Sequence, residues 1–262
     1  MAAISVKNLS YWIDKKLVLD SVSLQVSTAS ITGIIGGSGS GKTTLSRIIL
    51  GLPLANRSHF TGKVSILEKE QGQVEKRLLQ PIFQDPSLYF NPAWTLEQAL
   101  LEPLDINFSL TKSEKQQRIL QILDEFSLDS KSLSQKIPAF SGGELQRLCI
   151  IRSLLCQPKI LIMDEPVSAL DTVIQEEVVQ TILSLRKDKQ ISILFISHDI
   201  ELVLRICDSV YVMQEGKIVD SGSPEQIHKK AKHPYTQALL DSRDLSDIRQ
   251  QGTSVISSRY TE

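Results

Sequence analysis

A glycine-rich segment near the start of the chain has the residue types and spacing that hold a phosphate chain. It follows the apolar run Ile31 to Ile35 and reads Gly36-Gly37-Ser38-Gly39-Ser40-Gly41-Lys42-Thr43. This matches the pattern G-x-x-x-x-G-K-[ST] between a strand and a helix, a context that disfavours a chance glycine–serine loop. Glycines let several N–H groups turn toward one phosphate chain, and a helix starting near Lys42 adds its positive end. We therefore expect Lys42 to reach the β- and γ-phosphates of a nucleotide and the Thr43 hydroxyl to ligate Mg²⁺.

Two adjacent carboxylates end a second apolar run and complement this loop. Asp164 and Glu165 follow Ile160 to Met163, which has the character of a buried strand. Because side chains alternate along a strand, the two carboxylates point in different directions and can do different work. We expect Asp164 to lie in the Mg²⁺ shell and Glu165 to polarise a water for attack on the γ-phosphate. A carboxylate pair alone is often a solvated turn, but together with the loop at Lys42 it is specific.

A second candidate phosphate site lies at another helix start. Phe140-Ser141-Gly142-Gly143-Glu144 precedes a stretch of helical character. Ser141 is a favoured N-cap residue, and the two glycines let an anion approach the helix terminus. The alternative is an ordinary Ser-Gly-Gly turn. Its position shortly before the Asp164-Glu165 strand favours the phosphate site.

The elements that must position these residues indicate an α/β fold. The first stretch alternates as in an antiparallel sheet, with strands at Ile4 to Leu9 and Leu17 to Leu19 and alternation from Val22 to Val26. Further on, short and almost continuous apolar runs are separated by helical stretches, which favours parallel strands covered on both faces. These runs are Ile31 to Ile35, Ile160 to Met163, Ile191 to Ile196 and Val210 to Met213.

A mostly helical segment, about residues 86–157, is predicted as an insertion between two halves of the sheet domain. Within it, Thr111 and Glu114 have the spacing of a capping box. Gln214-Glu215-Gly216 predicts a hairpin turn. We expect residues 1–232 to form the nucleotide-binding domain, and 233–262 to form a short helix and a polar tail that is mobile or weakly docked.

Composition narrows the class of protein. The 262 residues carry 29 basic and 30 acidic side chains, so no bulk attraction to nucleic acid or anionic lipid is indicated. No apolar run reaches the roughly 18–20 residues that span a bilayer. Met1 to Ser10 lacks a secretory signal pattern, so we expect the domain to face the cytoplasm. Cys149, Cys156 and Cys207 show no C-x-x-C spacing and are interpreted as buried core thiols rather than metal ligands or a disulfide.

In these motifs the chain resembles the ATP-binding-cassette (ABC) ATPases, up to about Leu240. Ser141 to Glu144 is similar to the family's L-S-G-G-Q signature, with Phe140 and Glu144 as departures. The resemblance implies a P-loop NTPase (RecA-like) core with an N-terminal antiparallel β subdomain and an inserted helical subdomain. Gln84 resembles the Q-loop residue that touches Mg²⁺. Ser168-Ala169-Leu170-Asp171 resembles the D-loop, and His198 resembles the switch histidine. Tyr11 matches the aromatic residue that stacks on adenine, with Trp12 as a neighbouring candidate.

The resemblance implies a set of site residues. The implied catalytic residues are Glu165, His198 and Gln84, and the implied Mg²⁺ ligands are Thr43, Gln84 and Asp164. The implied ATP-binding residues are Tyr11, Gly36, Gly37, Ser38, Gly39, Ser40, Gly41, Lys42, Thr43 and Thr44. In this family two domains pair head to tail, so Ser141, Gly142, Gly143 and Glu144 of one face the ATP held at Lys42 of the other, with Asp171 in the D-loop.

A narrower resemblance is to the peptide and nickel importer ATPases of bacteria. It rests on Phe83-Gln84-Asp85-Pro86 with Asn91-Pro92, on the block from Asp164 to Asp171, and on His233-Pro234-Tyr235-Thr236 continuing to Leu240. It implies a second, identical or paralogous ATPase subunit, two membrane permease subunits, indirectly a solute-binding protein, and a peripheral position at the cytoplasmic face of the cell (inner) membrane. Many peptide members carry an iron–sulfur cysteine cluster after the domain, whereas no cysteine follows Cys207 here. This departure favours a short-tailed peptide, nickel or metallophore importer.

Two other classes remain as alternatives. One is an ABC-type ATPase of a soluble assembly, such as a carbon–phosphorus lyase accessory subunit, which resembles the same branch. The other is a DNA-repair or ribosome-acting ABC protein, which the single cassette, the lack of a zinc motif and the lack of basic excess disfavour. Permease and solute-binding genes beside this one would distinguish an importer from a lyase subunit.

Overall fold

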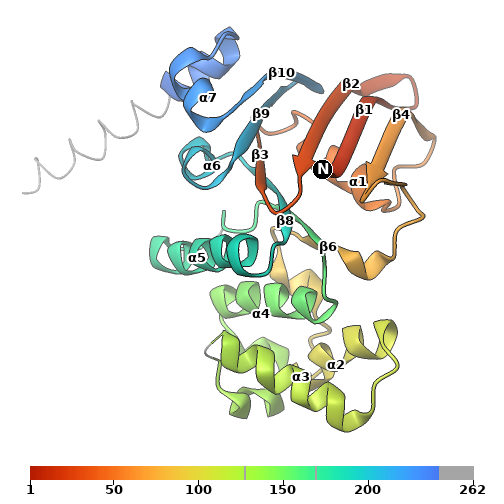
Figure 1. Ribbon diagram of the computed structural model, residues 1–262, viewed down its shortest axis with the longest axis vertical. Coiled ribbons are helices and arrows are strands. Elements are labelled where there is room, and N and C mark those ends of the chain that lie inside the picture. Colours follow the sequence, from red (N-terminus) through yellow and green to blue (C-terminus); the bar gives the residue numbers. More distant parts are fainter. Residues whose placement is uncertain (127, 169, 242–262) are drawn as a thin grey trace, which may run out of the picture.

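A computed structural model describes residues 1–126, 128–168 and 170–241 of the chain. Its N-terminal part is an antiparallel sheet with the order β2-β1-β4-β5 (Figure 1, red to orange). The strands are β1 (Ala2–Ile13), β2 (Lys16–Ser27), β4 (Ser58–Ile66) and β5 (Lys69–Glu70). The predicted alternation is present, since Val22, Leu24 and Val26 are buried and their neighbours are exposed. The two short strands expected on either side of Asp20 are one continuous strand, β2.

The second sheet carries the phosphate loop. Its order is β10-β9-β3-β8-β7-β6, parallel throughout except for the β9–β10 hairpin. The strands are β3 (Ile31–Ile35), β6 (Leu79–Ile82), β7 (Ile160–Asp164), β8 (Ser192–Ser197), β9 (Ser209–Gln214) and β10 (Lys217–Gly222). Every residue of β3, β7 and β8 is buried, as their continuous apolar character predicts. The predicted parallel strands and the hairpin at Gln214–Gly216 are therefore confirmed.

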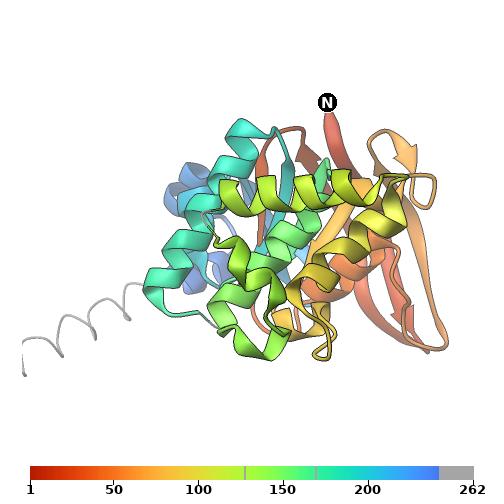
Figure 2. The ribbon, with the colours of Figure 1, turned by 90° about the horizontal axis from the view of Figure 1, so that it is seen from below.

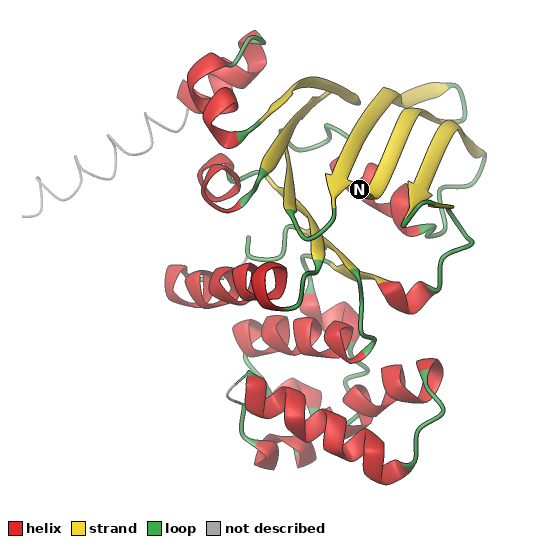
Figure 3. Ribbon diagram, viewed as in Figure 1, coloured by secondary structure: helices red, strands yellow, loops and turns green. Residues whose placement is uncertain are grey.

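The helical segment connects two neighbouring strands. It leaves the sheet after β6 and returns at β7, and these strands pair in parallel. Its helices are η2 (Pro86–Tyr89), α2 (Leu96–Asn107), α3 (Lys112–Glu125), η3 (Ser130–Ser134), η4 (Ile137–Ala139) and α4 (Gly142–Leu155). They gather at the end of the molecule away from the antiparallel sheet (Figure 3) and lie in front when it is seen from below (Figure 2). The predicted capping box of Thr111 and Glu114 is present at the start of α3.

The remaining helices flank the sheet of β3. They are α1 (Lys42–Leu50), η1 (Lys76–Leu78), α5 (Thr172–Asp188), α6 (Ile200–Ile206) and α7 (Pro224–Lys230). Residues 234–241 are helical as well, as expected for the start of the C-terminal segment. The polar tail beyond residue 241 lies outside the described residues.

Two apolar clusters sandwich the sheet. Alternate residues of β8 divide between them, with Ile193 and Phe195 in one cluster and Leu194 and Ile196 in the other. Both faces of the strand are thus covered, which explains its uninterrupted apolar sequence. All three cysteines are buried in the apolar core, as predicted, and burial raises the pKa of each. Among the described residues, none of the helices has the length and apolar character needed to cross a membrane.

Candidate nucleotide site

The phosphate loop joins the end of β3 to the start of α1. Gly41 has a φ of 103°, and a Cβ there would lie 2.7 Å from Leu19 Cδ2, so this position requires glycine. A Cβ at Gly36 would lie 2.2 Å from the carbonyl oxygen of Met213. The buried Lys42 ammonium donates to the carbonyl oxygens of Gly36 at 2.7 Å and Gly37 at 3.0 Å. Burial lowers the pKa of Lys42, and the nearby Glu165 and Asp164 oppose that shift.

A cavity of about 590 Å³ opens beside this loop. Five segments of the chain line it: Val18 of β2, the loop with the first turn of α1, Gln84 after β6, Glu165 after β7 and His198 after β8. Strands β6, β7 and β8 are parallel, so their carboxyl ends meet at one edge, where ligands of open α/β sheets bind. The loop residues in the lining are Ser38, Gly39, Ser40, Gly41, Lys42, Thr43 and Thr44.

Asp164 lies beneath the cavity as the last residue of β7. It is 4% exposed, and its Oδ2 accepts a hydrogen bond from the Ser46 hydroxyl at 3.1 Å. Burial is the largest influence on the pKa of this carboxyl and raises it, while the Thr43 and Ser46 hydroxyls lower it. Its Oδ1 is buried without a hydrogen-bond partner among the described residues. Mg²⁺ is a hard cation that prefers oxygen ligands. A buried carboxylate oxygen without a hydrogen-bond partner, together with the threonine hydroxyl, suits such an ion.

Glu165 occupies a different environment from its neighbour. Its backbone has a φ of 53°, an unusual conformation for a non-glycine residue, and its N–H donates to Ile196 O at 2.9 Å. Its Oε2 lies 2.8 Å from Nδ1 of His198. The side chain of His198 is 65% exposed, whereas that of Glu165 is 14% exposed. The two carboxylates do diverge, as predicted, but Glu165 lies beyond the end of β7, so its left-handed backbone and not strand alternation separates them. Only Glu165 lines the cavity.

The signature residues lie apart from this cavity. Ser141 caps α4, and its backbone N–H and hydroxyl donate to Glu144 Oε2 at 2.8 and 2.7 Å. Glu144 thus completes a capping box, which is the local reason that this departure from the family signature fits here. A Cβ at Gly142 would meet nothing within 4 Å, so the helix start is open to an approaching group.

The neighbouring D-loop contributes a helix cap. Asp171 accepts hydrogen bonds from the N–H groups of Val173 and Ile174 at the start of α5. Gly143 packs close to Ile174, since a Cβ there would lie 2.7 Å from Ile174 Cγ2. The signature and the D-loop are therefore neighbours, although neither lines the cavity at Lys42. Ala169 of the predicted D-loop lies outside the described residues.

The interpretation of Tyr11 as a stacking platform for adenine is wrong. Tyr11 is 2% exposed and packs in the apolar cluster between the antiparallel sheet, α1 and the sheet of β3, at a place where the pairing of β1 with β2 is irregular. Trp12 stacks on His59 with ring centroids 4.9 Å apart. The sequence reasoning also missed Val18, which lines the cavity, and Tyr235, which contacts Gly37. Val18 belongs to a predicted strand, but nothing in its residue type indicates that it faces a ligand.

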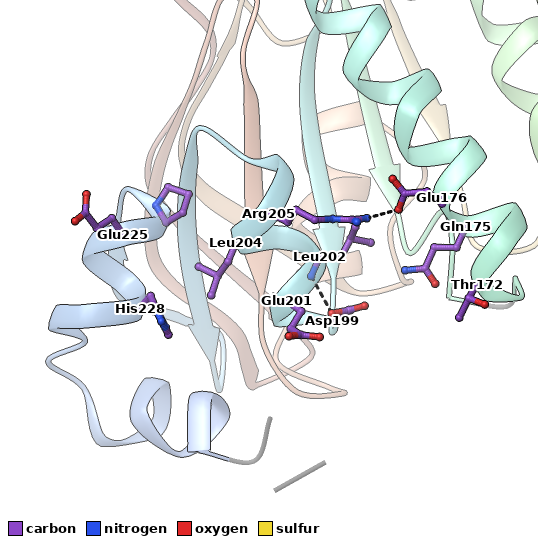
Figure 4. A pocket seen from close by; sticks show the side chains of 11 residues that line it. Thr172, Gln175, Glu176, Asp199, Glu201, Leu202, Leu204, Arg205, Glu225 and His228 are labelled. Carbon is purple, nitrogen blue, oxygen red and sulfur yellow. Dashed lines mark hydrogen bonds and ion pairs between the residues drawn. The ribbon is translucent and has the colours of Figure 1, made fainter. Parts of the chain in front are cut away.

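A second hollow, of about 660 Å³, lies between α5, α6 and α7 (Figure 4). Its wall contains the ion pair of Glu176 with Arg205 at 2.8 Å, and Asp199, which caps α6 by accepting from Leu202 N–H. It shares no residue with the cavity at Lys42. The ion pair joins α5 to α6, and the carboxylate of Asp199 is occupied as a helix cap.

Comparisons with known proteins agree with this geometry. The family described as ABC transporter matches residues 19–168. The dipeptide transport ATP-binding protein DppD of Haemophilus influenzae is 37% identical over 256 residues, covering 92% of this chain and 78% of that protein. DppF of Escherichia coli, also a dipeptide transport ATP-binding protein, is 35% identical over 227 residues, covering 86% of this chain and 68% of its own length.

Solved structures give the same fold. The structure of cbiO1 from Clostridium perfringens, part of the ABC transporter complex cbiONQ, has a TM-score of 0.77 at 25% identity. The match covers 87% of this chain and 91% of cbiO1. The resemblance in the motifs, the shared fold and the matched relatives lead to one conclusion: this chain belongs to the ABC transporter family.

Proposed function

We propose that this chain binds and hydrolyses ATP and thereby powers the import of peptides through separate membrane permease subunits. The observation that carries the proposal is the meeting of Lys42, Gln84, Glu165 and His198 at one cavity. The backbone N–H groups from Ser38 to Thr44 would surround the phosphates, and Lys42 would exchange its two loop carbonyls for phosphate oxygens. Val18 provides an apolar contact at the same cavity.

Mg²⁺ would be held by Thr43, Asp164 and Gln84. Among the described residues Asp164 Oδ1 is a buried acceptor without a hydrogen-bond partner, which the ion would satisfy, and the Thr43 hydroxyl is close enough to lower the pKa of that carboxyl. Gln84 is exposed at the cavity and offers an amide oxygen. When bound, the ion supplies positive charge that stabilises the transferring phosphoryl group.

Glu165 is the proposed general base. Its carboxylate would accept the proton of a water while that water's oxygen attacks the γ-phosphorus and the bond to ADP breaks. His198 would orient this carboxylate through the contact at 2.8 Å and present its other ring nitrogen toward the γ-phosphate. The left-handed backbone of Glu165 directs its side chain to the cavity, an instance of strain at a functional position.

The signature residues would act on the ATP of a partner subunit. Ser141, Gly142 and Gly143 present a capped and open helix terminus that lies outside the cavity of their own chain. A head-to-tail pairing with an identical or paralogous cassette would bring this terminus to the partner's phosphates, with Asp171 nearby. ATP binding would then close the pair and hydrolysis would release it, which lets ATP bias a bistable permease.

The proposed cargo is peptide rather than nickel or a metallophore. The support is the similarity to DppD and DppF over most of the chain. The permease pair and a solute-binding protein would select the cargo, and this subunit would act at the cytoplasmic face of the membrane.

The test is uptake by the reconstituted complex. The chain is purified with its permease subunits and placed in liposomes with a solute-binding protein. We expect labelled dipeptide or oligopeptide uptake that requires ATP and is lost with Lys42→Ala. Uptake of nickel without uptake of peptide would contradict the cargo, and an active lyase assembly in place of any uptake would contradict the transport role.

A further inference from the structure

The phosphate loop is contacted by a residue from the far end of the chain. The backbone N–H of Gly37 donates to the phenolic oxygen of Tyr235 at 2.7 Å, across a sequence separation of 198 residues. This oxygen also occupies the space beside the glycine, because a Cβ at Gly37 would lie 3.1 Å from it. Tyr235 is half-buried and packs against the main apolar cluster together with Leu239 and Leu240.

The segment before Tyr235 is anchored on the sheet. Asp220 of β10 accepts from the N–H of Lys232 at 3.0 Å and of His233 at 3.4 Å. The Nδ1 atom of His233 in turn accepts from the N–H of Tyr235 at 3.2 Å. Thr236 is completely buried. We call residues His233 to Thr236 the strap; its bonds determine where the phenol of Tyr235 lies.

The strap and the phosphate-binding lysine hold the same peptide unit. The N–H of Gly37 and the C=O of Gly36 belong to one planar peptide group. Its N–H donates to Tyr235, while its carbonyl oxygen accepts from Lys42 Nζ at 2.7 Å. If Lys42 turns away to bind a triphosphate, its bond to this peptide group is lost. Among the described side-chain contacts, the bond to Tyr235 then still holds the peptide group in place.

We propose that Tyr235 is a positioning residue for the phosphate loop, and that the strap links the C-terminal helix to the affinity for triphosphate. The proposal rests on the proposed function, in which Lys42 binds the β- and γ-phosphates. A glycine-rich loop has a large conformational entropy to lose on ordering, so a hydrogen bond that fixes its first peptide reduces the cost of binding. By linkage, bound triphosphate stabilises the docking of the strap by the same factor.

The test compares two tyrosine-to-phenylalanine substitutions. Tyr235→Phe removes the acceptor of Gly37 N–H, and Tyr211→Phe is the matched control, because its phenol accepts from Gln25 N–H at 3.1 Å, away from the loop. Affinities for Mg-ATP and for Mg-tripolyphosphate are measured by titration, together with urea unfolding. We expect Tyr235→Phe to weaken both ligands by about 3- to 10-fold, as for the loss of one hydrogen bond, and Tyr211→Phe to leave them unchanged.

A second pair of variants leaves the phenol in place. His233→Leu removes the acceptor for Tyr235 N–H, whereas His233→Asn keeps a short side-chain acceptor for an N–H two residues on. We expect weaker triphosphate binding for His233→Leu and restored binding for His233→Asn. Hydrogen exchange of the Gly37 amide should become faster in Tyr235→Phe and in His233→Leu.

The outcomes separate the two levels of the account. Failure of the wild-type chain to bind tripolyphosphate, or retention of binding by Lys42→Ala, would contradict the proposed function itself. Binding by wild type and its loss in Lys42→Ala, with Tyr235→Phe and His233→Leu binding as wild type does, would contradict the strap alone. Weakened ATP affinity with unchanged tripolyphosphate affinity would also overturn it, because the contact would then act on the base end of the site.

Discussion

At the scale of single residues, the cavity depends on two neighbouring carboxylates with opposite surroundings. Asp164 is buried against Ser46 and Thr43, whereas Glu165 turns to His198 at the cavity. The sequence predicts this division from strand alternation, but β7 ends at Asp164 and the cause of the division is different. The sequence does not predict that Glu165 has a left-handed backbone, which arises from the turn after β7.

Glu165→Gln tests the base. The amide keeps the size of the side chain but accepts no proton from water, so we expect ATP binding near the wild-type affinity and hydrolysis slower by about 100-fold or more. Steady-state turnover measured at saturating Mg-ATP gives the answer. Turnover close to that of the wild type would exclude Glu165 as the base.

Asp164→Asn tests the cost of the buried charge. Burial raises the pKa of the Asp164 carboxyl above its ordinary value of 3.8, so its charged form disfavours the nucleotide-free fold. The contribution of the protonated Asp164 to the free energy of unfolding is therefore present at low pH, and it is lost as the pH rises through the raised pKa. We expect Asp164→Asn to increase the free energy of unfolding at pH 7 by about 0.5–2 kcal/mol while Mg-dependent hydrolysis is lost.

Urea unfolding at several pH values measures this effect. The wild type should lose stability relative to Asp164→Asn as pH rises from the acidic range. A destabilised Asp164→Asn at pH 7 would show that the carboxylate is needed for folding rather than for the ion.

Some side chains of the candidate site are predictable from the sequence, and others are not. Lys42, Gln84, Glu165 and His198 were predicted to meet, and the structure brings them to one cavity. Tyr11 was misplaced because the inward face of β1 follows from its pairing with two neighbouring strands, which an aromatic residue type does not reveal. Tyr235 was noted only within a resemblance, since its contact with Gly37 joins distant segments.

At the scale of elements, four helices begin with a capping box, and in two of them the third residue is a glutamate. Thr111 caps α3 with Glu114 at the third position, and Ser141 caps α4 with Glu144 at the third position. The sequence predicts the box at Thr111 and the N-cap at Ser141, whereas the part that Glu144 plays in the second box is seen in the structure. Strand β6 was not predicted, because it is a four-residue edge strand that contains a proline.

The two caps make a matched pair of substitutions. Thr111→Ala and Ser141→Ala each remove one side-chain cap, so each should reduce the free energy of unfolding by about 1 kcal/mol. Only Ser141→Ala should slow ATP hydrolysis, by about 10-fold or more, because it also removes the hydroxyl that would contact the partner's charged phosphate in the proposed pairing. Unfolding curves and turnover are measured on both. Equal turnover in the two variants would mean that Ser141 only caps α4 and has no part in hydrolysis.

At the scale of the whole molecule, the two helix termini that we propose as phosphate sites lie at different places. The start of α1 lies at the cavity, and the start of α4 does not line it. Residue order predicts the insertion that holds α4, since the helical segment interrupts a parallel sheet between β6 and β7. A pairing of two cassettes is the arrangement that uses both termini on one ATP.

The ATP affinity of the isolated Ser141→Arg chain tests this arrangement most directly. A bulky side chain at the start of α4 should block a partner's phosphate while leaving Lys42 and Thr43 in place. Titration should therefore give an affinity close to that of the wild-type monomer, although cooperative hydrolysis is lost. A loss of affinity as large as that of Lys42→Ala would mean that the signature contacts ATP within its own chain, and the head-to-tail account would be wrong.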